Sequence, residues 1–301
     1  MRQTSLSKKS VKFSSYLIGT MRLGSWGENF NTSQWIDFIE KSLELGLRDF
    51  DHADIYGDYT TEADFGKALK DRPNLRTEMQ ITTKCGIKMP SESRPKYALK
   101  SYDSGEEHII ESVENSLRNL QTDYIDILLL HRPDFLMNPA EIATTFSKLQ
   151  EEGKVKYFGV SNFTPSQFEM LNTMIPLVTH QVEVSLSHLS PFENGTLDQL
   201  QMKNIQPTAW SPLGGGHFMH KGNTKSERNL NHILKRLSEK YELNAAQLML
   251  LFLKKHPSGI IPVLGTSKTD RLEEALAVKT KTIEKEDWYA LYSAAKGEEL
   301  A

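Results

Sequence analysis

The chain has 301 residues, of which 38% are hydrophobic and 25% are charged, and its formal net charge at neutral pH is −3. This composition is typical of a globular protein with a sizeable core, and the small acidic excess excludes a global electrostatic attraction to nucleic acid or acidic membranes. A single cysteine, Cys85, excludes an internal disulfide framework and indicates a reducing compartment, so we expect a cytoplasmic protein.

The chain begins with a basic, polar segment, MRQTSLSKKSVKF, which lacks the apolar stretch of a signal peptide. Short apolar runs then alternate with longer amphipathic ones. The short runs predict eight strands, over residues 16–19, 47–51, 79–84, 125–131, 157–162, 178–183, 206–211 and 259–265. Helical spacing of apolar residues predicts helices over 33–46, 61–70, 106–121, 139–152, 165–173, 194–203, 226–254 and 269–277, and an extra C-terminal helix over 282–295.

The alternation of strands and helices predicts a parallel sheet with helical crossovers. Eight strands in 301 residues favour a closed (β/α)8 TIM barrel, and a doubly wound open sheet is the alternative. No Pro- or Ser-rich linker interrupts the alternation, so we expect a single domain over residues 1–301. No apolar run reaches the ~20 residues that span a bilayer, and LGGGHFMHKGN at 213–223 predicts a long loop.

Polar side chains occur in or at the carboxyl ends of successive predicted strands. From the second strand to the seventh they are Asp51, Lys84, His131, Ser161 with Asn162, Gln181, and Trp210 with Ser211. The carboxyl ends of parallel strands meet at one face of a barrel and at one edge of an open sheet, so the pattern predicts a site in either fold.

Three of these residues, and Tyr56 five residues after Asp51, have ordinary explanations when each is considered alone. Asp51 can end a strand in a turn, Lys84 can extend to solvent, and His131 can be a hydrogen-bonded histidine at a strand edge. Tyr56 can be a half-buried aromatic residue. Their occurrence together near successive strand ends favours a catalytic site.

This set of four can protonate a carbonyl oxygen during its reduction. Tyrosine has an ordinary pKa of ~10, and we expect the neighbouring cation of Lys84 to lower it by stabilising the phenolate. Asp51 can keep Lys84 charged, and His131 can orient a substrate oxygen. General acid catalysis contributes roughly 10²–10⁴-fold. The hydride has to come from a cofactor, because no side chain delivers one.

Seven segments occur in an order that resembles the aldo-keto reductase superfamily over nearly the whole chain: DFDHADIYG, TTKCG, DILLLHRPD, GKVKYFGVSNF, HQVEVS, AWSPLGGG and IPVLGTSKTDRLEEAL. The resemblance implies a (β/α)8 TIM barrel with an N-terminal β-hairpin, and it implies NADPH as cofactor without a Rossmann motif. It also implies that Asp51, Tyr56, Lys84 and His131 are a catalytic tetrad in which Tyr56 donates the proton.

The same resemblance implies a set of cofactor contacts. Ser161, Asn162 and Gln181 are expected to bind the nicotinamide carboxamide, and Trp210 is expected to stack on the ring. Arg271, at the start of a predicted helix, is expected to bind a 2′-phosphate and so favour NADPH. The remaining expected contacts are Gly19, Thr20, Met21, Asp51, Ser211, Leu213, Gly214, Gly215, Gly216, Gly265, Thr266, Ser267, Lys268 and Glu274. The chain departs from the family pattern at Val263-Leu264-Gly265 and at Ala275, where the family often has a lysine and an asparagine.

The substrate is expected to be a small carbonyl compound, with Trp26, Tyr59 and Arg132 in its pocket. We expect no metal, since His52 and Asp54 lack a third ligand at a recognisable spacing. We also expect a monomer or weak oligomer, with neither nucleic acid nor membrane as a partner. Two alternatives stay open: an NADP-binding regulatory or redox-sensing barrel with little turnover, and a lyase or isomerase that uses Lys84 as a Schiff base.

Overall fold

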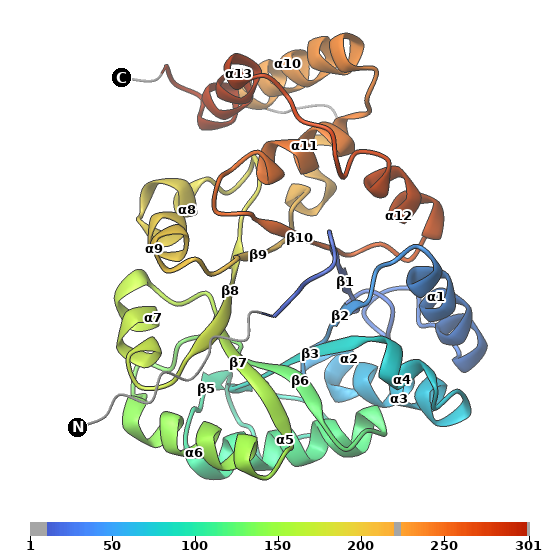
Figure 1. Ribbon diagram of the computed structural model, residues 1–301, viewed down its shortest axis with the longest axis vertical. Helices are drawn as coiled ribbons and strands as arrows, with labels where there is room; N and C mark the ends of the chain where they lie inside the picture. The colour runs from blue at the N-terminus through green and yellow to red at the C-terminus, as the bar shows by residue number, and fades with distance from the viewer. Residues whose placement is uncertain (1–10, 220–223, 300–301) are drawn as a thin grey trace.

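The computed structural model describes residues 11–219 and 224–299. Within these ranges eight parallel strands close into a barrel in the order β1–β10–β9–β8–β7–β6–β3–β2 (Figure 1). The strands are β1 Leu17–Gly19, β2 Asp49–Asp51, β3 Gln80–Cys85, β6 Ile125–Leu130, β7 Val155–Ser161, β8 Leu177–Glu183, β9 Thr208–Trp210 and β10 Ile261–Leu264. The closed order confirms the predicted barrel and excludes the open sheet.

Helices surround the strands as the outer layer of the barrel (Figure 1). The longer ones are α1 Thr32–Glu44, α3 Thr61–Asp71, α5 Glu106–Leu120, α6 Pro139–Glu151, α7 Pro165–Asn172, α9 Thr196–Lys203, α11 Ala245–Lys254 and α12 Thr269–Leu276. Short helices, α2 Tyr56–Tyr59, α4 Leu75–Glu78, α8 Ser190–Glu193 and the 3-10 helix Gly214–Met219, occur in connections. The predicted C-terminal helix is α13, Lys285–Lys296, which packs with α10, Lys225–Tyr241, outside the ring of helices.

The predicted single helix over 226–254 is wrong, because the chain forms the two helices α10 and α11 there. Glu242 ends α10 in the left-handed region, with φ 54°. Asn244 then caps α11 by accepting a hydrogen bond from the backbone N–H of Gln247. In return, the side-chain oxygen of Gln247 accepts from the backbone N–H of Asn244. This capping box supplies partners for amides at a helix start, so a new helix begins where the apolar spacing alone predicts continuation.

The resemblance gives no bounds for the predicted N-terminal β-hairpin, and residues 1–10 lie outside the described residues. Residues 11–16 lead into β1 without forming a strand. An antiparallel ribbon occurs elsewhere, after β3, where β4 Ile87–Lys88 pairs with β5 Ser101–Tyr102. This ribbon lies in the connection that follows Lys84.

The strands of the barrel are apolar because helices cover their outer face and the barrel interior covers their inner face. All six residues of β6, IDILLL, are buried, as expected for a parallel strand between helices and barrel interior. On the helix side, Phe146 of α6 stacks on Phe158 of β7 with ring centroids 4.0 Å apart. The parallel register aligns the carboxyl ends of the strands, with Gly19 opposite Asp51 and Ser161 opposite Gln181. The polar residues that end these strands therefore meet at one face.

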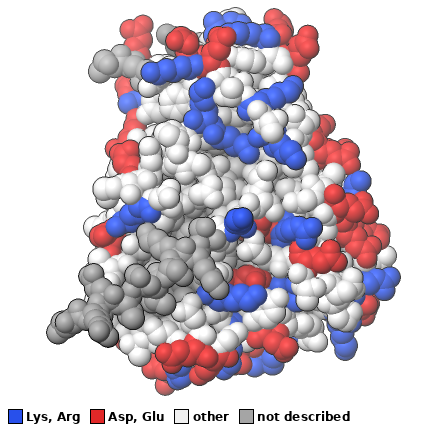
Figure 2. All heavy atoms as spheres, viewed as in Figure 1, with Lys and Arg blue, Asp and Glu red and all other residues white. Residues whose placement is uncertain are grey.

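Acidic and basic side chains are interspersed on the face seen in Figure 1, as the space-filling view of Figure 2 shows. This mixture agrees with the small net charge of −3. Across the described ranges, no helix has the length and apolar character that crossing a membrane requires.

Candidate active site

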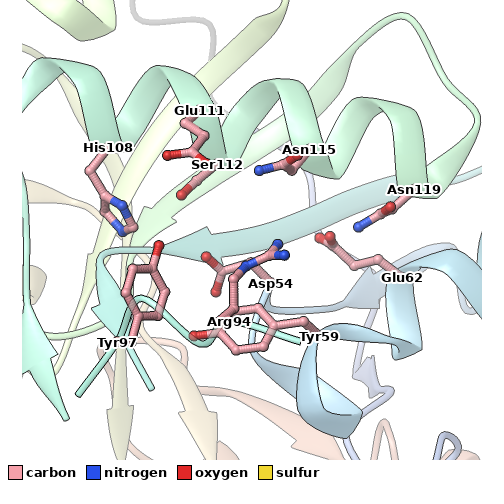
Figure 3. Close-up of a pocket in the computed structure, with 10 residues that line it drawn as sticks. All are labelled: Asp54, Tyr59, Glu62, Arg94, Tyr97, His108, Glu111, Ser112, Asn115 and Asn119. Atoms are coloured by element: carbon pink, nitrogen blue, oxygen red, sulfur yellow. The ribbon is translucent and has the colours of Figure 1, made fainter. Parts of the chain in front are cut away.

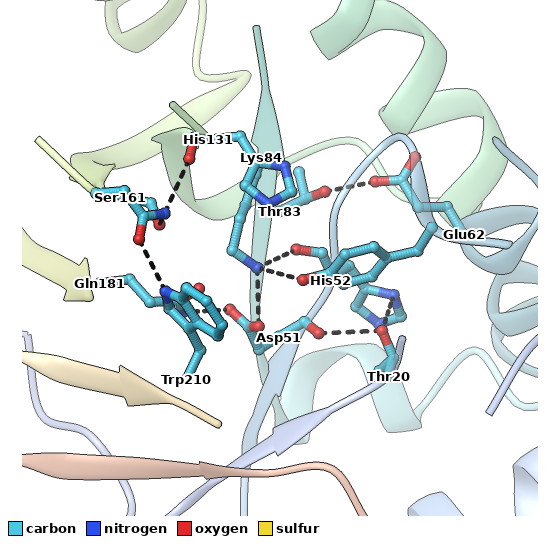
Figure 4. Close-up of polar contacts among 12 residues, drawn as sticks. Thr20, Asp51, His52, Glu62, Thr83, Lys84, His131, Ser161, Gln181 and Trp210 are labelled. Carbon is cyan, nitrogen blue, oxygen red and sulfur yellow. Dashed lines mark hydrogen bonds and ion pairs between the residues drawn. The ribbon is translucent and has the colours of Figure 1, made fainter. Parts of the chain in front are cut away.

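Three of the four predicted catalytic residues are in contact at the carboxyl ends of β2 and β3 (Figure 4). The ammonium group of Lys84 donates to Asp51 Oδ2 at 2.8 Å and to the backbone oxygen of His52 at 2.7 Å. It also lies 3.3 Å from the hydroxyl oxygen of Tyr56. The side chain of Lys84 is 0% exposed and that of Asp51 is 3% exposed. A lysine this deeply buried is normally paired, and here its three donor positions are all satisfied.

The surroundings hold Lys84 charged and Tyr56 protonated. Burial alone lowers the pKa of Lys84, but Asp51 and Tyr56 outweigh it, so the pKa is raised above its ordinary value. Burial raises the pKa of Tyr56, and the opposing effect of Lys84 offsets this in part. Lys84 lowers the pKa of Tyr56 as expected, but desolvation of the phenolate is the larger effect, so the pKa of Tyr56 lies above its ordinary value.

A strained turn presents Tyr56 to Lys84. Tyr56 begins α2, and Gly57, Asp58 and Tyr59 follow it with φ of 59°, 60° and 68°. A Cβ on Gly57 would lie 2.4 Å from Thr61 Oγ1, so only glycine fits there. Ser25 Oγ donates to the oxygen of Gly57 at 2.9 Å and holds this turn against the loop after β1. The Tyr-Gly pair in the sequence thus reflects a backbone requirement.

His131 completes the predicted tetrad beside Tyr56. The two rings are 6.0 Å apart and nearly perpendicular. Burial, followed by the cations of Lys84, Arg132 and Lys100, holds the pKa of His131 well below its ordinary value. The imidazole is therefore neutral near pH 7. On the other side of Tyr56, the ring of Trp26 lies 6.3 Å away, so this predicted pocket residue does border the tyrosine.

The expected nicotinamide contacts form a connected set of hydrogen bonds (Figure 4). Trp210 Nε1 donates to Asn162 Oδ1 at 2.9 Å, and Asn162 Nδ2 donates to Ser161 Oγ at 2.7 Å. Gln181 Nε2 donates to Asp51 Oδ1 at 2.8 Å, which links this set to the catalytic cluster. The contact between Gln181 and Asp51 has no signal in the sequence, because it joins residues far apart in the chain.

The expected phosphate contacts lie in two glycine-containing loops. Ser211 has φ 49°, and Gly215 and Gly216 have φ of 65° and 83°. A Cβ on Gly215, Gly216 or Gly265 would have no atom within 4 Å, so open space lies beside these glycines. Backbone amides beside such space can approach a phosphate closely. Leu213 and Gly214 belong to the same stretch after β9 and are partly buried.

The start of α12 carries unpaired positive charge. Within residues 11–219 and 224–299, the side chains of Lys268 and Arg271 have no hydrogen-bond or ion-pair partner, and no side chain caps this helix start. Thr266 Oγ1 accepts from the backbone of Lys268, and Ser267 Oγ donates to Glu28 at 3.3 Å. Free amides and two cations at a helix start suit an anion, so these residues fit the phosphate groups of a dinucleotide.

The other predicted cofactor residues are placed less directly. Thr20 is fully buried and donates to the backbone oxygen of Asp51 at 3.0 Å, so it supports the catalytic strand end. Gly19 packs closely on β10, and Met21 is 39% exposed at the rim. Glu274 accepts from Asn244 at 3.2 Å. Within the described residues, no group of three or more His, Cys, Asp or Glu side chains is arranged to hold a metal ion.

Tyr59 lines a second, polar pocket between α3, α5 and the loop that carries Arg94 (Figure 3). Its hydroxyl accepts from the backbone N–H of Met89 at 2.9 Å, and the guanidinium of Arg94 lies 4.7 Å from its ring centroid. Asp54 and Glu62 also line this pocket. Glu62 accepts from Thr83 Oγ1 at 2.5 Å. Successive residues of a strand point to opposite faces, so this pocket lies on the outer side of β3, opposite Lys84.

Comparison with known proteins places the site in context. The sequence model of the Aldo/keto reductase family matches residues 17–296. The chain is 41% identical over 297 residues to the uncharacterized oxidoreductase YcsN of Bacillus subtilis, covering 97% of both chains. It is 38% identical over 305 residues to a 6-dehydroglucose reductase of Agrobacterium fabrum, covering 100% of both. An aldo/keto reductase of Klebsiella pneumoniae, solved with NADP and acetate, has the same fold, with a TM-score of 0.74 and 23% identity over 93% of this chain and 90% of that one.

Proposed function

Since the chain belongs to the aldo/keto reductase family, we propose that it reduces the carbonyl group of an aldehyde or ketone to an alcohol, with NADPH as the hydride donor and Tyr56 as the proton donor. The observation that carries this proposal is the buried contact of Lys84 with both Asp51 and Tyr56 at the mouth of the barrel. A tyrosine beside a fixed ammonium group is suited to release a proton to a developing alkoxide.

When bound, NADPH would supply the hydride that adds to the carbonyl carbon and would leave as NADP+. As that C–H bond forms, the electron pair of the carbonyl π bond moves to oxygen, which takes the proton from the Tyr56 hydroxyl. Lys84 balances the phenolate that this transfer leaves, because Asp51 keeps its ammonium group charged and in place. The neutral His131 can hydrogen-bond the same oxygen and orient it. Preorganised charges in a water-excluded site are usually the largest source of catalysis.

The choice of NADPH rests on the two loops described above and on Arg271. Trp210, held by Asn162, offers a flat ring to the nicotinamide. Ser161 and Gln181 lie within the same set of hydrogen bonds. Arg271 can bind a 2′-phosphate bidentately at the start of α12. The NADP complex of a reductase with this fold supports the same cofactor.

The reaction type is supported by the 38% identical relative named a 6-dehydroglucose reductase. By its name, that enzyme reduces an oxidised sugar, which is a carbonyl reduction. We infer the reaction type from this relative, while the substrate of the present chain is a separate question.

The test is the rate of NADPH oxidation with a reactive aldehyde such as 4-nitrobenzaldehyde. We expect turnover by the natural protein and a loss of roughly 10²–10⁴-fold in Tyr56→Phe, which removes the acid and keeps the ring. Binding of NADPH, followed by quenching of tryptophan fluorescence, should survive in Tyr56→Phe and should be tighter than binding of NADH.

The outcomes separate the candidate functions. Equal NADPH consumption by the natural protein and Tyr56→Phe would show that the assigned acid is wrong. Tight NADPH binding without turnover of any aldehyde would favour the regulatory or sensing role. Borohydride trapping of a substrate on Lys84 would favour Schiff-base chemistry.

A further inference from the structure

We propose that the carbonyl substrate carries an anionic group, a carboxylate or a phosphate, and that Arg132 binds it. This inference rests on the proposed function, and it goes further by assigning a substrate class. Its basis is the place of the Arg132 guanidinium at the mouth of the barrel and the lack of any acidic partner for it.

Arg132 lies over the expected nicotinamide platform and next in sequence to His131, whose ring packs against that of Tyr56. It directly follows His131, just past the carboxyl end of β6. Its guanidinium carbon lies 5.5 Å from the ring centroid of Trp210. Its positive charge also acts on the hydroxyl of Tyr56 and on the ring of His131. A substrate whose carbonyl reached Tyr56 and His131 would therefore place its next few atoms near Arg132.

The positive charge of Arg132 is not neutralised by the protein. Within residues 11–219 and 224–299, no hydrogen bond or ion pair joins its side chain to an acidic group. The nearest acidic residue along its loop is engaged elsewhere: Asp134 accepts from the backbone N–H and hydroxyl of Ser104, both at 3.1 Å, and from the backbone of Leu136 at 2.8 Å. A half-buried guanidinium without an acidic partner has lost hydration without gaining a counter-charge, so it favours negative charge in a ligand.

Two aromatic side chains lie near Tyr56 and Arg132. Trp26 lies beside Tyr56 at a ring-centroid distance of 6.3 Å, and the guanidinium of Arg132 lies over the ring of Trp210. The guanidinium can meet a carboxylate or phosphate with two parallel N–H bonds, which would fix the orientation of the substrate as well as its charge.

The experiment compares matched anionic and neutral aldehydes. The first pair is 4-carboxybenzaldehyde and its methyl ester, and the second is glyceraldehyde 3-phosphate and glyceraldehyde. We expect kcat/KM to favour the anionic member of at least one pair by roughly 10–100-fold, the range of a hydrogen bond to a charged group. In Arg132→Gln this ratio should fall to near one, mainly through KM. Lys285→Gln, which removes one positive charge from exposed Lys285 on α13, should keep the ratio of the natural protein.

Binding to Tyr56→Phe loaded with NADP+ provides a readout that does not need turnover. There, 4-(hydroxymethyl)benzoate should bind more tightly than its methyl ester, and the difference should disappear when Arg132→Gln is added. A ratio near one in both pairs, or one that Arg132→Gln leaves intact, overturns the proposal. An effect in one pair alone identifies the group as carboxylate or phosphate. If no aldehyde is reduced but the binding difference depends on Arg132, the proposed reaction fails while the anion site stands.

Discussion

Two carboxyl groups three residues apart, the buried Asp51 and the partly buried Asp54, have opposite electrostatic surroundings. Asp51 faces the barrel interior, where it accepts from Lys84 at 2.8 Å and from Gln181 at 2.8 Å. Asp54 faces the polar pocket of Figure 3, where its Oδ1 has no hydrogen-bond partner among the described residues. Burial, followed by the neighbouring charge of Glu62, raises the pKa of Asp54 well above its ordinary value.

The difference shows that burial by itself does not decide the state of a carboxyl group. The ammonium group of Lys84 and the amide of Gln181 compensate the carboxyl group of Asp51, whereas an acid next to another acid tends to bind a proton. Glu62 follows the same rule as Asp54, since burial raises its pKa and the contacts with Thr83, Ser116 and Asn119 offset this in part. Asp51, which is paired with Lys84, belongs to the proposed catalytic site. Asp54 has no such partner among the described residues, so its ionised form is costly in free energy at neutral pH.

The largest effect is expected when the cation is removed from the ion pair of Asp51 and Lys84. Lys84→Met should cost about 3–5 kcal/mol of unfolding free energy, because it leaves the carboxylate of Asp51 buried without its counter-charge. Urea denaturation followed by circular dichroism measures this loss. The control is Lys88→Met, which breaks an ion pair with Asp103 whose side chains are 31% and 33% exposed and should cost about 0–1 kcal/mol. Equal losses in the two variants would contradict the account.

A second test removes the ionisable group from the unpaired site. Because the folded pKa of Asp54 is raised, its protonated form stabilises the fold at low pH, and this stability is lost as pH rises above the ordinary aspartate value of ~3.9. Asp54→Asn should therefore lose less stability than the natural protein between pH 4 and neutral pH. The measurement is the free energy of unfolding as a function of pH. Parallel curves for the two proteins would mean that Asp54 is ionised in the fold.

The smallest expected effect concerns Arg94, which lies at the same pocket and opposes the rise in the Asp54 pKa. Arg94→Gln should raise that pKa further, so that the loss of stability continues to higher pH, by less than about 1 kcal/mol because the guanidinium is partly exposed. Arg94→Lys keeps the charge and is the matched control. The carboxyl signal of Asp54 in a pH titration by NMR reports the shift directly, and identical titration curves for both variants would exclude a role for the charge.

Much of the fold could be predicted from the sequence because each element carries a local pattern. Eight apolar runs correspond to the eight barrel strands. The pair Thr164-Pro165 is typical of a helix start, and Thr164 caps α7. The pattern failed where two helices meet at Glu242, since apolar spacing continues across the break and only the left-handed backbone and the cap of Asn244 mark it.

The candidate site was predictable at the level of residue types and less so at the level of contacts. The proposed catalytic set could be named because Asp51, Lys84 and His131 lie at the ends of successive predicted strands. The direction of the Tyr56 pKa was not predictable, because it depends on how burial and the Lys84 charge balance. Tyr59 illustrates the same limit. Its side chain lines the pocket of Asp54, and its position in the sequence does not predict this direction.

The sequence by itself determined which elements form and which residues stand at their carboxyl ends, because the apolar period and the turn and cap residues act over a few neighbours. The tertiary structure alone decided that Asp51 receives a cation and an amide while Asp54 receives another acid. Those partners come from β3, β8 and α3, and their distances and desolvation exist only once the barrel has closed.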